Sequence, residues 1–329
     1  MQESILVVGG AGYIGSHTAK LLEKRGYRPV ILDDLSTGHQ PAARSLPFYQ
    51  GSYHDTSLLK TILTDHKINT VMHFGAKAIV GESVANPLLY YSANAGGTLR
   101  LFEAMIDAGA GHFIFSSTCA TFGEPKEVPI HENVTQSPVN PYGQSKLFVE
   151  KILKDIHKAH KINSVILRYF NAAGADPDGE LGEDHKPETH LIPKAIQVAL
   201  GREKKLTVNG KDYPTKDGTC IRDYVHINDL ADAHIRAMEY LWKNPSCSDF
   251  NLGSEKGFSV LEVIEAVSKT AGKPVAHEFG PRRPGDPPVL IADSKKAKQV
   301  LGWAPKFSLE EIVATAYRWT KEHPDGYDI

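Results

Sequence analysis

The sequence predicts an α/β protein with a doubly wound parallel sheet and a second, smaller, mixed α/β domain. In the first half of the chain, five short runs rich in β-branched and other apolar residues alternate with segments of helical length. These runs are residues 5–8, 29–32, 70–74, 113–116 and 164–168. Strands joined by helical crossovers pair in parallel and are covered on both faces, which explains their almost continuous apolar character.

The first run leads directly into a glycine turn, GGAGYIG over residues 9–15, and then into a helix predicted to continue from residue 16 to 24. Glycines allow the tight turn and let backbone amides approach a pyrophosphate, as in Rossmann-type dinucleotide sites. The second strand ends at Asp33, whose carboxylate suits ribose hydroxyls and repels a 2′-phosphate. The pattern therefore favours NAD, held by Gly9, Gly12, Tyr13, Ile14, Gly15 and Asp33.

The run at residues 113–116 continues into three hydroxyl residues, the last of which is Thr118. Tyr142 and Lys146 stand four residues apart in a helix predicted to begin after Pro141, so they share one face. An ammonium beside the phenol, with the positive nicotinamide nearby, lowers a tyrosine pKa from about 10 and makes Tyr142 a usable base. We therefore predict Tyr142, Lys146 and Thr118 as the catalytic residues of a redox reaction.

After the fifth run the regular alternation ends, and glycine and proline become frequent. We expect an NAD-binding domain over residues 1–173 and a substrate-binding domain over residues 174–329, with some later segments returning to the first domain. The second part contains a clear helical pattern over residues 228–242. It also contains Ser308 and Glu311 at the spacing of a capping box, which marks the start of another helix.

Charge and cysteine content exclude several classes of protein. The formal net charge is −2, which gives no basic field, so we expect no nucleic-acid partner. The chain has no apolar run of membrane-spanning length and no room for a signal peptide before its first strand. Cys119, Cys220 and Cys247 are far apart and odd in number, which favours a reducing, cytoplasmic setting.

The strand-end hydroxyls, Tyr-x-x-x-Lys and the glycine turn together resemble the extended short-chain dehydrogenases/reductases. Over nearly the whole chain, the sequence is similar more narrowly to the UDP-glucose (UDP-galactose) 4-epimerase family. The order and spacing of the matching passages make this resemblance specific. They are residues 9–17, 81–84, 116–123, 140–143, 168–171, 217–224 and 282–286.

The resemblance implies NAD-dependent 4-epimerisation of a UDP-hexose. Tyr142 then removes the proton of the sugar's 4-hydroxyl, Lys146 binds the nicotinamide ribose and tunes Tyr142, and Thr118 hydrogen-bonds to that hydroxyl. C4 gives its hydride to NAD, and the 4-keto sugar turns over and takes it back on its other face. The resemblance also implies NAD contacts from Phe74, Lys77, Asn94 and Phe170.

The resemblance further implies a nucleotide-sugar site formed by Thr118, Tyr142, Asn171, Leu191, Arg222, Arg283, Asp286 and Leu290. Arg222 and Arg283 match positions that clamp the UDP phosphates, for which a planar guanidinium is well suited. Asp286 matches a ligand of the uridine ribose. Side-chain bulk at the position of Leu290 is associated with admitting or refusing N-acetylated sugars, and the intermediate size of leucine leaves the preferred sugar open.

Some positions depart from the family pattern. Ser52 stands where an aspartate usually meets adenine, and Lys77 lies one position before the family's lysine, at Ala78. His190 replaces the more usual asparagine beside Leu191. The roles of Ser52, Lys77 and His190 therefore stay open.

The resemblance also implies a homodimer, built from the helix after Pro87 and the helix that carries residues 142–157. Their amphipathic patterns permit such an interface, but the same faces would also suit packing inside a monomer. The oligomeric state therefore stays open.

Related enzymes offer alternatives. Nucleotide-sugar 4,6-dehydratases carry Asp-Glu directly after the strand-end threonine, where this chain has Cys119 and Ala120, and decarboxylating relatives carry a glutamate in that segment. Neither Cys119 nor Ala120 can exchange protons in that role, which argues against elimination. A 4-epimerase of UDP-xylose/UDP-arabinose or of a UDP-N-acetylhexosamine remains an alternative.

Two other classes are weaker candidates. A catalytically silent NAD-sensing protein would tend to lose the Tyr-Lys pair, which this chain keeps. A metal-dependent hydrolase is suggested only by the histidines of residues 185–190, whose spacing is not H-E-x-x-H. Pro187 also interrupts any helix that would align ligands there, so the sequence predicts no metal.

Overall fold

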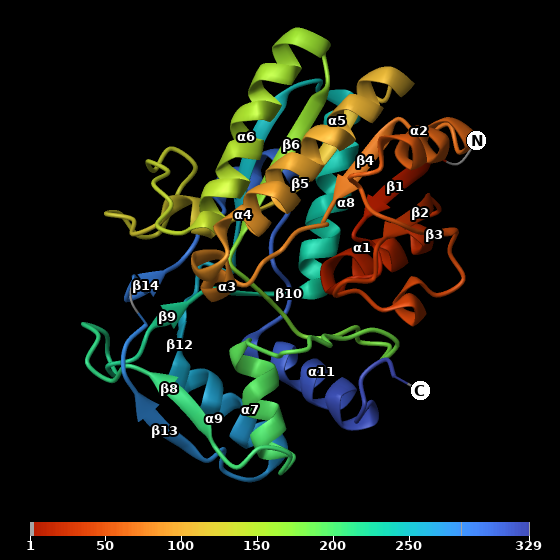
Figure 1. Ribbon diagram of the computed structural model, residues 1–329. Coiled ribbons are helices and arrows are strands. Elements are labelled where there is room, and N and C mark those ends of the chain that lie inside the picture. The colour runs from red at the N-terminus through yellow and green to blue at the C-terminus, as the bar shows by residue number, and fades with distance from the viewer. Residues whose placement is uncertain (1–2, 284, 329) are drawn as a thin grey trace.

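The computed structural model describes residues 3–283 and 285–328 and is built on a seven-stranded sheet whose pairings are all parallel (Figure 1). The strand order is β11–β6–β5–β4–β1–β2–β3. The strands are β1 (Ser4–Val8), β2 (Arg28–Asp33), β3 (Phe48–Gln50), β4 (Thr70–His73), β5 (His112–Thr118), β6 (Asn163–Tyr169) and β11 (Cys247–Leu252). The order reverses at β1, between β2 and β4, and such a switch point is where open α/β sheets bind ligands.

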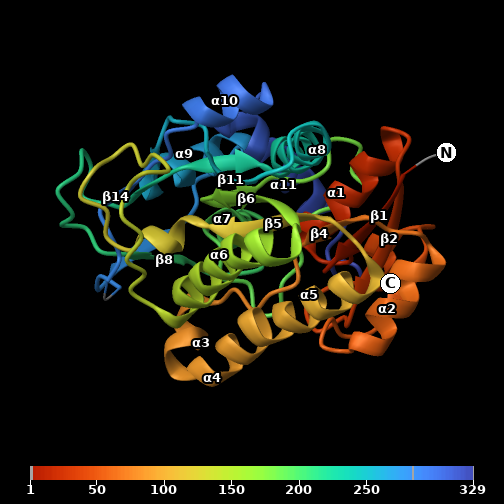
Figure 2. The same ribbon diagram turned by 90° about the horizontal axis from the view of Figure 1, so that it is seen from above.

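The predicted doubly wound fold class is confirmed, because all five predicted strands lie in this sheet and helices cover both of its faces. Figure 2 shows the two helical layers on opposite sides of the sheet. One layer contains α1 (Tyr13–Lys24), α8 (Ile227–Lys243) and α10 (Lys295–Leu301), and the other α2 (Thr56–Asp65), α5 (Gly97–Ala108) and α6 (Pro141–His160). The alternation along β1 serves both layers: Val7 packs with Leu22 of α1, and Leu6 with Ile62 of α2.

A second lobe lies below the sheet in Figure 1 and has its own hydrophobic core. It holds three small sheets, of which two pair β8 with β13 and β7 with β10, and the third has the order β12–β9–β14. Its strands are β7 (Asn171–Ala173), β8 (Leu206–Asn209), β9 (Ile221–Arg222), β10 (Tyr224–His226), β12 (Phe258–Ser259), β13 (His277–Gly280) and β14 (Val289–Leu290). Its helices are α7 (Leu191–Ala199), α9 (Val260–Ala271) and α11 (Leu309–Glu322), and the predicted capping box of Ser308 and Glu311 opens α11.

The chain returns to the first lobe after residue 174, because α8, β11 and α10 all pack with the large sheet. Helix α8 lies along α1, where Arg25 pairs with Asp232 and the hydroxyl of Tyr27 donates to Glu239 at 2.9 Å. β3 and β11 were not among the predicted strands. β3 has only three residues, and β11 reads CSDFNL, which lacks the apolar run of a buried strand.

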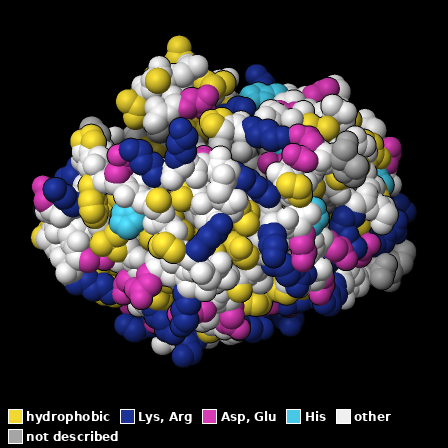
Figure 3. All heavy atoms as spheres, turned by 90° about the horizontal axis from the view of Figure 1, so that it is seen from below, with side chains coloured by type: hydrophobic (Ala, Val, Ile, Leu, Met, Phe, Trp, Pro, Cys, Tyr) yellow, Lys and Arg dark blue, Asp and Glu magenta, His cyan; other side chains and the backbone are white. Residues whose placement is uncertain are grey.

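Charged side chains of both signs are interspersed with apolar ones on the face seen from below in Figure 3, in keeping with the small net charge. Among the described residues, no helix combines the length and the apolar character needed to cross a membrane.

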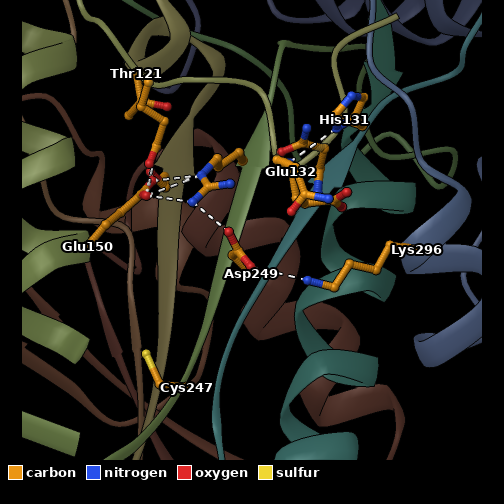
Figure 4. Close-up of polar contacts among 12 residues, drawn as sticks. Thr121, His131, Glu132, Glu150, Cys247, Asp249 and Lys296 are labelled. Atoms are coloured by element: carbon orange, nitrogen blue, oxygen red, sulfur yellow. Dashed lines mark hydrogen bonds and ion pairs between the residues drawn. The ribbon is translucent and has the colours of Figure 1, made fainter.

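A buried ion pair anchors α6 to the sheet. Arg168 of β6 points to the face that α6 covers and is held by Glu150, with Nη2 2.7 Å from Oε2 and both side chains 1% exposed. Glu150 also accepts a hydrogen bond from Ser117 of β5 at 2.6 Å. Figure 4 shows the network continuing to Asp249 of β11 and then to Lys296 of α10. The network therefore joins three neighbouring strands to two helices.

We expect Glu150→Gln to lower the free energy of unfolding by about 3 kcal/mol, because neutralising one partner leaves a buried guanidinium poorly compensated. Urea denaturation followed by fluorescence and circular dichroism measures this change. Glu103→Gln is the matched control, because Glu103 pairs with Arg100 at 2.9 Å but both side chains are more than half exposed. Equal, small effects of the two substitutions would contradict an anchoring role for Glu150.

Candidate active site

The glycine turn after β1 fits the phosphates of a dinucleotide. Gly9 has a φ of +75°, and a Cβ there would lie 2.6 Å from the backbone nitrogen of Gly75. A Cβ on Gly15 would lie 2.1 Å from the carbonyl oxygen of Gly9, so this position is closed by the turn itself. Gly12, by contrast, has no atom closer than 3.4 Å to such a Cβ, and it caps α1 without a side-chain hydrogen bond. The first amides of α1 are therefore open to an anion.

Asp33 is fixed beside this turn at the end of β2. Its Oδ2 accepts a hydrogen bond from the amide of Ala11 at 3.0 Å and its Oδ1 one from the amide of Leu35 at 2.9 Å. The side chain is only 7% exposed. The turn and the carboxylate thus have the relative placement that an NAD pyrophosphate and its ribose require.

Asn94 ties the cofactor side of the site to the catalytic helix. It lies in a π-helical turn (Tyr91–Gly96) between α4 (Pro87–Tyr90) and α5, a feature that is frequent at functional sites. Its amide accepts from the backbone nitrogen of Lys77 at 2.8 Å and donates to the Lys77 carbonyl and to Ser145 Oγ, each at 3.0 Å. These bonds hold the backbone of Lys77 against α6. A contact from the Lys77 side chain to the cofactor stays a prediction.

The two predicted aromatic cofactor residues occupy different surroundings. The amide of Phe74 donates to the Val8 carbonyl at 2.8 Å, which holds Phe74 beside the end of β1. Phe170 is 9% exposed and packs in a small cluster whose partly buried members include Cys119 and Leu290. Phe170 therefore lies beside Leu290, a predicted substrate residue, and its contact with the cofactor stays a prediction.

The three predicted catalytic residues converge at the end of β5. Tyr142 and Lys146 project from one face of α6, which begins with Pro141 and is capped by Asn140. The Lys146 ammonium donates to the Ser116 carbonyl at 3.0 Å and lies 4.9 Å from the ring centroid of Phe115. The Tyr142 hydroxyl meets the side chain of Thr118.

Burial decides the protonation of this pair. It raises the pKa of Tyr142 to about 12, against the hydrogen bond with Thr118, and it lowers the pKa of Lys146 to about 7, against the attraction of Glu150. The expected lowering of the Tyr142 pKa is therefore not produced by the protein alone. Lys146 is 4% exposed and Tyr142 is partly buried beside it, and a low-dielectric site disfavours the charged form of each group.

The sequence alone gave no role to Tyr90 and Glu82, which lie behind Tyr142, the predicted base. The Tyr90 ring meets the Tyr142 ring edge-on, with centroids 6.5 Å apart. The Tyr90 hydroxyl lies 2.7 Å from Glu82 Oε2 and accepts from the amide of Ile79 at 2.9 Å. Glu82 lies in α3 (Val80–Ala85), within the matching passage at residues 81–84, which was the only signal that pointed to it.

On the substrate side, the pairing of β9 with β14 places Leu290 in register with Arg222. The guanidinium of Arg222 pairs with Asp286, and the Asn171 amide donates to the carbonyl of the neighbouring Asp223 at 2.8 Å. These four predicted substrate residues therefore lie around one small sheet. Leu191 is the first residue of α7.

Arg283 lies beside Asn209 at the end of β8. With its oxygen turned to the guanidinium, the Asn209 amide accepts from Nε and Nη2 of Arg283 at 3.0 and 3.1 Å. Pro284, in the matching passage at residues 282–286, lies outside the described residues. Asn209 is a positioning residue for Arg283 that sequence analysis missed, because Asn209 ends β8 whereas Arg283 lies in the loop after β13, far away in the chain.

The positions that follow Thr118 do not supply an acid or a base. Cys119 and Ala120 form a short 3₁₀ turn with the next two residues, and burial raises the pKa of the Cys119 thiol to about 12. A thiol with that pKa stays protonated near neutral pH, and alanine has no titratable group. The geometry therefore supports transfer of a proton and hydride at one carbon, without elimination.

A dinucleotide turn, a strand-end threonine and a Tyr-Lys pair on one helix face within this two-lobed fold define an extended short-chain dehydrogenase/reductase. The family model described as GDP-mannose 4,6 dehydratase matches residues 6–316. Within this group, the chain belongs to the UDP-glucose 4-epimerase family, and the resemblance stated from its sequence is confirmed.

Several known proteins support this family assignment. A UDP-glucose 4-epimerase of Halalkalibacterium halodurans is 51% identical over 325 residues, which cover 98% of this chain and 97% of the relative. The crystal structure of UDP-glucose 4-epimerase from Brucella ovis in complex with NAD matches with a TM-score of 0.94 and 47% identity, over 96% of this chain and 98% of the other. The enzyme from Bifidobacterium longum in complex with NAD+ and UDP matches with a TM-score of 0.94 and 38% identity, over 98% and 99%.

We expect Gly12→Ala to weaken NAD binding by at least roughly tenfold, about 1.4 kcal/mol, because a methyl group there intrudes where the pyrophosphate approaches the backbone. The melting temperature of the NAD-stripped variant should stay close to that of the NAD-stripped wild type, since the Cβ makes only an ordinary van der Waals contact, 3.4 Å from the Gly9 carbonyl oxygen. Gly15→Ala is the contrasting variant, because its Cβ collides with the turn and should lower the melting temperature. Calorimetric titration with NAD and thermal melts measure both effects; unchanged NAD affinity of Gly12→Ala would contradict this placement of the pyrophosphate.

Proposed function

We propose that this protein interconverts UDP-glucose and UDP-galactose by NAD-dependent epimerisation at C4. One observation carries the proposal: Thr118, Tyr142 and Lys146 come together at the end of β5, where Thr118 and Lys146 are buried and Tyr142 is partly buried. The NAD complex from Brucella ovis and the NAD+ and UDP complex from Bifidobacterium longum support the cofactor and the nucleotide part of the substrate.

The chemistry follows from what these side chains can hold and move. When bound, NAD+ accepts hydride at its nicotinamide and adds the positive charge that favours the phenolate form of a nearby tyrosine. Thr118 hydrogen-bonds the sugar's 4-hydroxyl, and Tyr142 removes the proton of that hydroxyl and returns it after the 4-keto sugar has turned over. Lys146 with a pKa of about 7 can supply a charge beside the phenol near neutral pH without being locked in one protonation state.

The second lobe binds the nucleotide part in this proposal. Arg222 and Arg283 clamp the two phosphates, and Asp286 binds the uridine ribose and meanwhile pairs with Arg222. Leu290 lies in the cluster of Phe170 and Cys119, where its bulk limits the space at the sugar. An epimerase of UDP-pentoses or UDP-N-acetylhexosamines uses the same chemistry, so the preferred sugar is decided by assay.

Purified protein should carry NAD and interconvert UDP-glucose and UDP-galactose without added cofactor. Tyr142→Phe should lower kcat by at least roughly 100-fold, because both proton transfers need the phenol, while UDP affinity stays nearly unchanged. Product separation after incubation with UDP-hexoses, UDP-pentoses and UDP-N-acetylhexosamines identifies the preferred sugar. Absence of NAD binding, or near-normal turnover of Tyr142→Phe, would overturn the proposal.

We also propose that the protein is a homodimer. Exposed apolar side chains gather on neighbouring helices of the α6 layer: Val84 of α3 is 63% exposed, Leu88 of α4 79% and Phe148 of α6 40%. The Phe148 ring stacks with Tyr91 at 5.8 Å between centroids, which joins the two helical segments into one surface. Figure 2 shows α3 and α4 at the outer edge of this layer. A second copy of the same surface would cover these residues by a two-fold contact.

Leu88→Asp should shift the protein from dimer to monomer, because a charge at the centre of an apolar interface cannot be buried without a partner. Sedimentation equilibrium or light scattering measures the change in mass. Val300→Asp is the matched control, since Val300 is 42% exposed on α10, on the opposite side of the sheet. A wild-type protein that is monomeric at micromolar concentration would refute the dimer.

The cytoplasm is the compartment that we propose for this protein. Cys119, Cys220 and Cys247 are all free thiols, and Cys220 is buried. Free thiols of this kind persist most readily in a reducing environment.

A further inference from the structure

Two histidines and two glutamates outside the catalytic group turn their ligand atoms toward one another in the loop before α7. This loop cluster consists of Glu183, His185, Glu188 and His190. One nitrogen or oxygen atom from each residue lies within 4.8 Å of the corresponding atoms of the other three. The absence of a helix at Pro187 does not keep these side chains apart, because the loop itself folds them together.

The spacing of the loop cluster resembles that of ligands around a shared metal ion. Nδ1 of His190 lies 2.6 Å and Nδ1 of His185 3.2 Å from the same oxygen of Glu183. The carboxylate of Glu188 lies 3.4 Å from His190 Nδ1 and 3.7 Å from His185 Nδ1. Ligands of a tetrahedral zinc ion, with bonds of about 2.0–2.2 Å, are separated by roughly 3.3 Å. Three of the four distances are close to this value, and the 2.6 Å hydrogen bond between His190 and Glu183 would have to lengthen to admit the ion.

The two carboxylates are held in place before any ion arrives. Glu183 is only 6% exposed, and Glu188 accepts hydrogen bonds from the amides of Thr189 and His190 at 2.6 and 2.7 Å. Lys186, the lysine of this loop, pairs instead with Asp328. Two carboxylates close together, one of them nearly buried and the other partly buried, are stabilised by positive charge. A divalent ion would neutralise both while the imidazoles bind as neutral ligands.

We propose that the loop cluster binds one divalent transition-metal ion of the zinc class. Two imidazoles and two carboxylates form a closed four-ligand set, which suits a structural ion rather than a catalytic one. The cluster borders a hollow formed with the end of α11 and the residues after it, so an ion can enter from solvent.

The position of the loop cluster indicates what the ion would do. The ring of Tyr13, at the start of α1 beside the glycine turn, meets His185 edge-on with centroids 6.2 Å apart. His190 caps α7, whose first residue, Leu191, is a predicted substrate contact. In Figure 1 the segment before α7 crosses between the sheet and the second lobe. The ion would therefore fix the crossing segment and the start of α7, and its loss should raise the KM for the UDP-sugar more than it lowers kcat.

The test uses full-length, tag-free protein stripped with a chelator and titrated with Zn²⁺ by calorimetry. We expect one ion per chain, a higher melting temperature with Zn²⁺, and visible d–d absorption typical of tetrahedral coordination when Co²⁺ replaces it. The double variant Glu183→Gln/His185→Asn should bind Zn²⁺ at least roughly 100-fold more weakly, since changes to residues that only hold the ligands in place already cost about 10–100-fold. Circular dichroism of the metal-free variant checks that it is folded.

Glu127→Gln is the matched control, because Glu127 and His131 form an exposed pair at 3.4 Å outside the loop cluster. It should bind Zn²⁺ as the wild type does. A wild type that binds no Zn²⁺, or binds it no better than the double variant, would overturn the proposal and leave the loop cluster as direct histidine–glutamate ion pairs. If the variant fails to fold, the wild-type stoichiometry and the Co²⁺ spectrum still decide. Epimerase activity of the stripped protein is measured separately, so failure of the metal-site proposal can be told apart from failure of the proposed reaction.

Discussion

The contact between one face of α6 and the ends of β5 and β6 is the constraint on which the site depends. Tyr142, Lys146 and Glu150 follow one another at intervals of four residues, so all three point to the sheet. Glu150 binds Arg168 and Ser117 within the interior, and these contacts fix the position of α6 along its axis and its rotation about that axis. A small rotation of α6 would carry the Tyr142 hydroxyl away from Thr118, and the buried ion pair opposes it, because separating these charges in the interior is costly.

The same burial that orders the helix also sets the electrostatics of the reaction. It pushes the pKa of Tyr142 up and that of Lys146 down to about 7, so the protein by itself keeps Tyr142 neutral and leaves Lys146 only partly charged near neutral pH. The positive charge needed to form a phenolate is therefore tied to a bound cationic cofactor. This arrangement makes proton transfer depend on the hydride acceptor being present.

The second lobe is assembled from short strands and a long crossing segment, which suits binding more than chemistry. Its arginines and Asp286 lie on strand ends and turns, where the residues that hold a substrate can vary without disturbing the sheet. The returning helix α8 packs against α1, and the loop cluster lies beside Tyr13 at the start of the same helix. Both contacts join the second half of the chain to the element that begins at the cofactor turn.

The sequence by itself determined the sheet, the glycine turn with Asp33, and the Tyr-Lys pair, because each is encoded by short-range spacing: apolar runs, glycines before a helix, and residues four apart. It did not reveal β11, whose polar sequence is tolerated through its pairing with β6 and the ion network around Asp249. It also missed Tyr90 behind Tyr142, Asn209 beside Arg283, and the convergence of Glu183 and His190. These contacts join segments that are distant in the chain and meet only on folding, so the tertiary structure decided them. Burial also decided the pKa of Tyr142, which is higher than the lysine four residues away would by itself suggest.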